Sequence, residues 1–73
     1  MTLRKRSLLL AGHATSVALE PEFWAALEAL AKSRGLSLPA LIARLDADRG
    51  ARPLASACRV AALQWAAGAQ RPG

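Results

Sequence analysis

The sequence predicts a small, mainly α-helical fold that begins with one short β-strand and assembles as a dimer. Side chains alternate with a period of two from Thr15 to Leu19, and apolar residues then recur at helical spacing in two segments. A third segment is apolar on nearly every side. A domain of 73 residues buries only about 60% of the surface that its unfolded chain exposes, so a partner chain is expected to cover this third segment.

In the expected strand, one set of side chains faces the core and the other faces outward. The core-facing set is Thr15, Val17 and Leu19, and the outward-facing set is Ala14, Ser16 and Ala18. The preceding segment Ser7–Leu10 is compatible with a second short extended piece or with an arm, and the sequence leaves both open. We expect His13 to be a turn residue rather than a ligand or a base contact.

The first helix is expected to begin at Pro21, in a favoured first-turn position with acidic residues on both sides. Gly35 is a natural residue to end it. Its apolar stripe recurs at i, i+4 and i+7 and consists of Phe23, Leu27 and Leu30.

The second helix is expected to begin after Ser37, whose hydroxyl suits an N-cap, with Pro39 in the first turn. The segment 46–53 contains a glycine and a proline and is expected to be a solvated loop. Asp46 and Asp48 lie in it without a third ligand nearby, so a metal site is not expected there. The apolar stripe of this helix is Leu38, Leu41, Ile42 and Leu45.

The third helix is expected over about Leu54–Ala67, with Cys58 as a small buried apolar residue rather than a redox switch. We therefore divide the chain into a basic N-terminal arm (1–6), a domain with this added helix (7–67) and a frayed tail (68–73). The expected dimer core is made of Thr15, Val17, Leu19, Leu41, Ile42, Leu45, Val60 and Trp65.

Composition narrows the function classes. Ten Lys and Arg against five Asp and Glu give a net charge of +5, which favours a polyanionic partner. One cysteine excludes an intrachain disulfide and a cysteine-rich zinc site. Because no nucleophile–base pair, phosphate-binding glycine loop or metal-ligand set is recognisable, we expect neither an enzyme nor a cofactor. The short apolar run Leu8–Ala11 fits neither a signal peptide nor a membrane span, so the protein is expected to be cytoplasmic.

Several segments together resemble the ribbon-helix-helix family of bacterial DNA-binding proteins. The strand T-S-V-A-L, the helix opening E-P-E-F-W and the interhelical R-G-L-S-L carry this resemblance. K-R-S, A-G-H-A-T-S and L-A-S-A-C-R-V further resemble a subgroup of short bacterial proteins built almost entirely from this domain. The similarity extends over roughly Lys5 to Trp65.

The resemblance implies a homodimeric DNA-binding protein, and a transcriptional regulator in particular. One strand from each subunit would form an antiparallel ribbon in the major groove of double-stranded DNA, where outward side chains read bases. Ser37 and Leu38 would stand at a phosphate-binding helix N-terminus. In this family the side chains that contact bases are usually long and polar, whereas Ala14 and Ala18 are small.

The tribasic segment Arg4, Lys5 and Arg6 would compensate for these small readers as a flexible arm on the DNA. The alternative is a dimeric protein–protein interaction module with weak or no DNA binding. Its docking surface would be the third helix.

Overall fold

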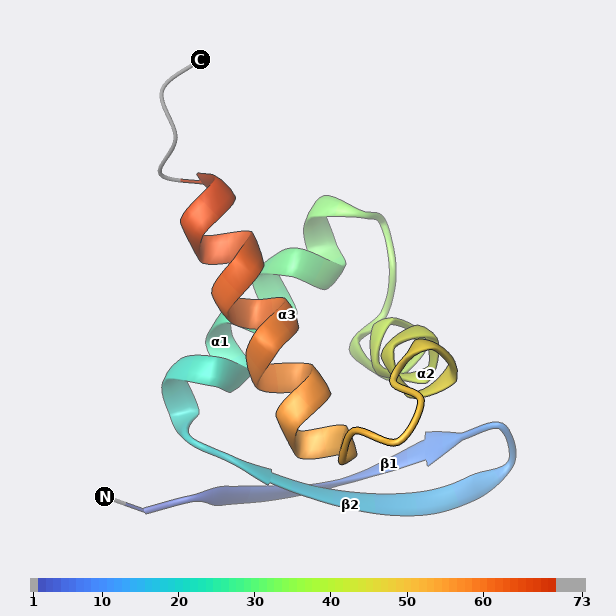
Figure 1. Ribbon diagram of the computed structural model, residues 1–73. Helices are drawn as coiled ribbons and strands as arrows, with labels where there is room; N and C mark the ends of the chain where they lie inside the picture. The colour runs from blue at the N-terminus through green and yellow to red at the C-terminus, as the bar shows by residue number, and fades with distance from the viewer. Residues whose placement is uncertain (1, 70–73) are drawn as a thin grey trace.

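The computed structural model describes residues 2–69, which form a β-hairpin followed by three helices (Figure 1). The elements are β1 (Arg4–Leu10), β2 (His13–Leu19), α1 (Pro21–Ser33), α2 (Leu38–Asp48) and α3 (Leu54–Ala69). The helices lie on one side of the hairpin, and α3 packs against α1.

The expectation of a single strand is wrong, because β1 and β2 form a two-stranded antiparallel sheet within one chain. A two-residue turn joins them, with Ala11 at φ 49° and Gly12 at φ 82°. Two consecutive residues with positive φ are the geometry that matches the twist of a tight hairpin. His13 is the first residue of β2 and follows this turn directly, and its side chain is exposed. Of the two readings left open for Ser7–Leu10, the second strand is the one present.

The boundaries of α1 and α2 follow from local signals. Pro21 occupies the first turn of α1. Gly35 has φ 68°, and the N–H of Leu36 donates to the carbonyl of Ala31 at 2.9 Å. A hydrogen bond to the carbonyl five residues earlier, with a glycine in the left-handed conformation just before the donor, is the Schellman motif that ends many helices. At the start of α2, the hydroxyl of Ser37 accepts from the N–H of Ala40 at 3.2 Å, which makes it the N-cap.

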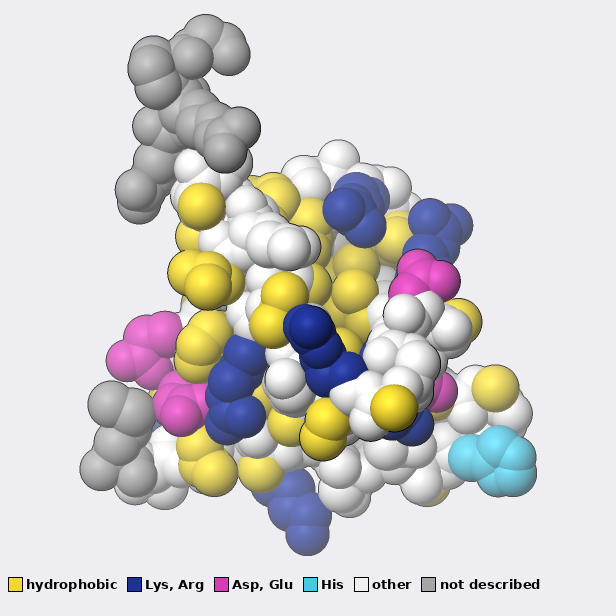
Figure 2. Space-filling view, viewed as in Figure 1, with side chains coloured by type: hydrophobic (Ala, Val, Ile, Leu, Met, Phe, Trp, Pro, Cys, Tyr) yellow, Lys and Arg dark blue, Asp and Glu magenta, His cyan; other side chains and the backbone are white. Residues whose placement is uncertain are grey.

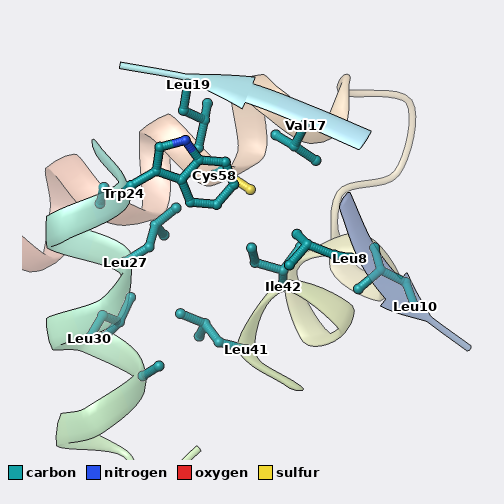
Figure 3. Close-up of a cluster of buried hydrophobic side chains, with 12 residues drawn as sticks. Leu8, Leu10, Val17, Leu19, Trp24, Leu27, Leu30, Leu41, Ile42 and Cys58 are labelled. Atoms are coloured by element: carbon teal, nitrogen blue, oxygen red, sulfur yellow. The ribbon is translucent and has the colours of Figure 1, made fainter. Parts of the chain in front are cut away.

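The core lies between the inner face of the hairpin and the three helices (Figure 3). Trp24 is the largest side chain in it and is only 2% exposed. Small residues of α3, including the fully buried Cys58, pack against the other helices. The buried set is Leu8, Leu10, Val17, Leu19, Trp24, Leu27, Leu30, Ala31, Leu41, Ile42, Cys58 and Ala62. The single chain therefore covers one side of the apolar third helix by itself.

Candidate nucleic-acid interface

The hairpin has two chemically different faces. On the inner face, Leu8, Leu10, Val17 and Leu19 are buried against the helices. On the opposite face, three cross-strand pairs point away from the core. We call these pairs the outer ribbon face; they are Lys5 with Ala18, Ser7 with Ser16, and Leu9 with Ala14. Only Ala18 among them is half-buried, and the others are exposed.

The outer ribbon face changes in character along its length. Lys5 supplies a cation at the end near the termini of the hairpin, and the Ser7 and Ser16 hydroxyl oxygens lie 3.4 Å apart at its centre. Leu9 stands next to the turn and is 68% exposed. The face therefore offers charge, hydrogen-bonding groups and apolar surface in a row.

The three basic residues predicted as an arm lie within β1 instead, and the strand divides them between two faces. The guanidinium of Arg6 points to the helix side, where it is 2.7 Å from a carboxylate oxygen of Glu28 and 4.8 Å from the centre of the Trp24 ring. Arg4 is exposed, and its carbonyl accepts a 2.8 Å hydrogen bond from Nε1 of Trp24. Only Lys5 of the three belongs to the outer ribbon face.

The predicted phosphate-binding turn is exposed at Ser37 and half-buried at Leu38. Because the Ser37 hydroxyl caps α2, the first turn of this helix starts in an ordered geometry. Helix N-termini carry backbone N–H groups without intrahelical partners and a partial positive charge. The structure thus places Ser37 and Leu38 at the N-terminus of α2.

The predicted dimer-core residues fall into two groups in the single chain. Four of them are buried within the chain: Val17, Leu19, Leu41 and Ile42. Thr15 is half-buried. The remaining three are partly buried and line shallow surface pockets beside α3. They are Leu45, Val60 and Trp65.

Two titratable groups have shifted pKa values. A backbone hydrogen bond and the guanidinium of Arg59 lower the pKa of Glu20, whose carboxylate oxygen lies 3.1 and 3.0 Å from two Arg59 nitrogens. Burial raises the pKa of Cys58 to about 11. Neither group lies on the outer ribbon face. Glu20 precedes α1 and pairs with Arg59 of α3, and Cys58 lies in the core.

Basic side chains are spread over several elements rather than gathered in one patch on the side shown in Figure 2. Among residues 2–69, no cluster of three or more His, Cys, Asp or Glu side chains is arranged to hold a metal ion. Within the same range, no helix is both long and apolar enough to cross a bilayer.

Sequence reasoning did not single out Ser7 and Leu9 as outward residues. The signal that was available is the two-residue Ala11–Gly12 spacing between two extended segments, which is typical of a tight hairpin.

Comparison with known proteins is consistent with this geometry. The family model described as "Ribbon-helix-helix domain" matches residues 3–66, which include the hairpin and nearly all of the three helices. Searches of curated proteins and of solved structures found no significant match. With most of its length matched by this family, and with a ribbon followed by helices in the expected order, the chain belongs to the ribbon-helix-helix domain family.

Proposed function

We propose that this protein is a DNA-binding transcriptional regulator that acts as a homodimer and places its outer ribbon face in the major groove. The observation that carries the proposal is the composition of this face. Lys5, Ser7 and Ser16 are exposed there and take no part in the core. Membership of a family whose members generally bind DNA and a net charge of +5 support the same function.

The homodimer is proposed to form through the edge of β2 that does not pair with β1. Among the described strands, β2 has one neighbour only, so its other edge offers backbone donors and acceptors. Pairing with the same strand of a second copy about a two-fold axis would satisfy them. The two β2 strands would then be central, and each β1 would lie outside.

The dimensions of the major groove suggest how this sheet would bind. Strands lie about 4.8 Å apart, so four of them span about 14 Å between the outer two. The groove is about 12 Å wide and admits a two-stranded ribbon. The central strands would therefore present Ala14, Ser16 and Ala18 to the bases. The flanking strands would bring Lys5 to the phosphates. Arg4 has the register of the opposite face, but it is exposed at the first position of β1 and would reach a second phosphate from the end of the strand.

The phosphate-binding turn of α2 completes the proposed interface. Backbone N–H groups at Ser37 and Leu38 would hold a phosphate and fix the orientation of the protein on the duplex. Arg6 is assigned a structural role instead, since its guanidinium is already placed between Glu28 and Trp24.

The salt dependence of duplex binding tests this proposal. If Arg4 and Lys5 of both subunits neutralise four phosphates, log affinity should fall with log salt at a slope of about −0.9 × 4, or roughly −3.6. Lys5→Ala should flatten the slope by about 1.8, since it removes one phosphate contact in each subunit. Lys32→Ala is the matched control, because Lys32 is an exposed lysine in the last turn of α1. Fluorescence anisotropy of a labelled duplex measures both slopes.

Two further measurements complete the test. Ser16→Ala should relax base preference and leave the slope unchanged, because hydroxyl contacts to bases carry sequence information and little charge. Sedimentation of the native protein at micromolar concentration should give a dimer. A folded monomer would contradict the dimeric arrangement, and equal slopes for Lys5→Ala and the native protein would contradict the placement of the ribbon.

A second candidate function is a dimeric interaction module that binds a protein partner through α3. The favouring observation is Leu63, which is 66% exposed on this helix. This candidate predicts no salt-sensitive duplex binding. Leu63→Ala would then impair partner binding, whereas Lys5→Ala would not.

A further inference from the structure

The end of the outer ribbon face nearest the turn is apolar. Leu9 is 68% exposed and stands opposite Ala14 in the hairpin register, while its neighbours in β1, Leu8 and Leu10, are buried. The core therefore accounts for the side chains on both sides of Leu9 but not for Leu9 itself. The hydroxyl and lysine groups of this face lie nearer the other end.

The chemistry of this pair restricts what it can recognise on DNA. A leucine and an alanine side chain neither donate nor accept hydrogen bonds, so they cannot distinguish the polar groups of base edges. Among the four bases, thymine alone presents an apolar group in the major groove, its C5-methyl. This methyl projects on the backbone side of the base edge, which is where a flanking strand would lie.

We propose that Leu9 and Ala14 form an apolar contact that selects binding sites with thymine at the matching position. This inference rests on the proposed function, because it requires the outer ribbon face to enter the groove. The same face carries Lys5, Ser7 and Ser16. Double-stranded DNA is a polyanion whose base edges carry both hydrogen-bond acceptors and methyl groups. A face with a cation, hydroxyl groups and an apolar pair therefore complements DNA better than it complements an apolar protein surface.

Replacing thymine by uracil tests the contact, because this change removes the methyl group and keeps the base-pairing edge. Duplexes of about 20 base pairs, roughly two helical turns, would first be enriched from a random pool by the native protein. They would then be resynthesised with deoxyuridine in place of thymidine. We expect affinity to fall about fourfold for each thymine methyl that Leu9 no longer covers, the factor associated with burying one such group. Fluorescence anisotropy at constant salt measures the ratio.

Variants assign the effect to the proposed residue. Leu9→Ala should bind the thymidine and deoxyuridine duplexes almost equally, because the larger apolar surface is gone. Leu63→Ala is the matched control: Leu63 is similarly exposed but lies on α3, so this variant should keep the native preference. Circular dichroism and thermal melting would establish that both variants fold.

The outcomes separate this inference from the proposed function. Equal affinity of the native protein for the two duplexes would overturn the thymine contact while leaving DNA binding intact. A preference that survives in Leu9→Ala would overturn the assignment to Leu9. Failure to enrich any duplex would overturn the proposed function and the thymine contact with it.

Discussion

Replacing Trp24 with Phe tests whether α1 holds β1 in position. The indole is 2% exposed, and its Nε1 donates to the carbonyl of Arg4 at 2.8 Å. The guanidinium of Arg6 lies 4.8 Å from the same ring. Phenylalanine keeps an aromatic ring at this position, but it has no N–H to reach β1 and leaves part of the volume empty.

The expected loss of stability has two parts. An ordinary hydrogen bond contributes about 1 kcal/mol net. Removing three buried heavy atoms costs about 1–3 kcal/mol more, depending on how far the surrounding side chains close the space. Together the two parts amount to about 2–4 kcal/mol. Proteins are stable by about 0.05–0.15 kcal/mol per residue, so a chain of this length has roughly 4–11 kcal/mol in total.

Urea denaturation followed by circular dichroism measures the global loss of stability. Hydrogen exchange of backbone amides measures where it falls, and we expect protection to decrease most in β1, because the missing hydrogen bond ends there. Trp65→Phe is the matched control, since Trp65 is only partly buried on α3. If the two variants are equally stable, or if β1 amides lose no more protection than those of α2, the anchoring role of Trp24 is refuted.

One chemical modification and three substitutions have defined outcomes. Because burial raises the pKa of Cys58 to about 11, iodoacetamide should modify it slowly at pH 8 and quickly once urea unfolds the chain; rapid reaction of the folded protein would contradict the buried thiol. The backbone hydrogen bond and Arg59 lower the pKa of Glu20, so its contribution to stability is complete above the ordinary value of 4.5 and is lost as pH falls through the lower folded value. Urea midpoints measured across this acid range should therefore depend less on pH in Glu20→Gln, and an unchanged dependence would argue against the contribution. Ser37→Ala should destabilise the protein by about 0.5–2 kcal/mol through removal of the N-cap, as thermal melting measures. If the turn also binds phosphate through its backbone, a folded Leu38→Glu variant should bind duplex DNA more weakly than Ser37→Ala; equal binding would exclude that site.

Much of the helical part of this fold was predictable from the sequence, because helices depend on local signals. Pro21 at the start of α1, Gly35 after its end and the hydroxyl of Ser37 before α2 are each read from a few neighbouring residues. α3 was recognisable from its apolar character, and it extends to Ala69, so the first two residues of the predicted frayed tail are helical. The rest of that predicted tail, 70–73, lies outside the described residues. These signals act within one turn of the chain, so no distant contact is needed to interpret them.

The composition of the outer ribbon face, in contrast, depended on contacts between distant segments. The run Leu8–Leu10 does not alternate in polarity, so the sequence cannot show that Leu9 alone points outward. The basic run Arg4–Arg6 does not alternate in polarity either, and its three residues were predicted to act together as one arm. Arg6 turns inward because Trp24 and Glu28, one helical turn apart on α1, present a ring and a carboxylate beside β1.

The family, the helices and the excess of positive charge could therefore be predicted from the sequence alone. Only the tertiary structure shows that β1 pairs with β2 within one subunit, and which side chains of this hairpin remain exposed to a partner. The physical reason is that a strand has two faces and two edges. Which face is buried and which edge is paired depend on elements far along the chain, such as α1 against β1.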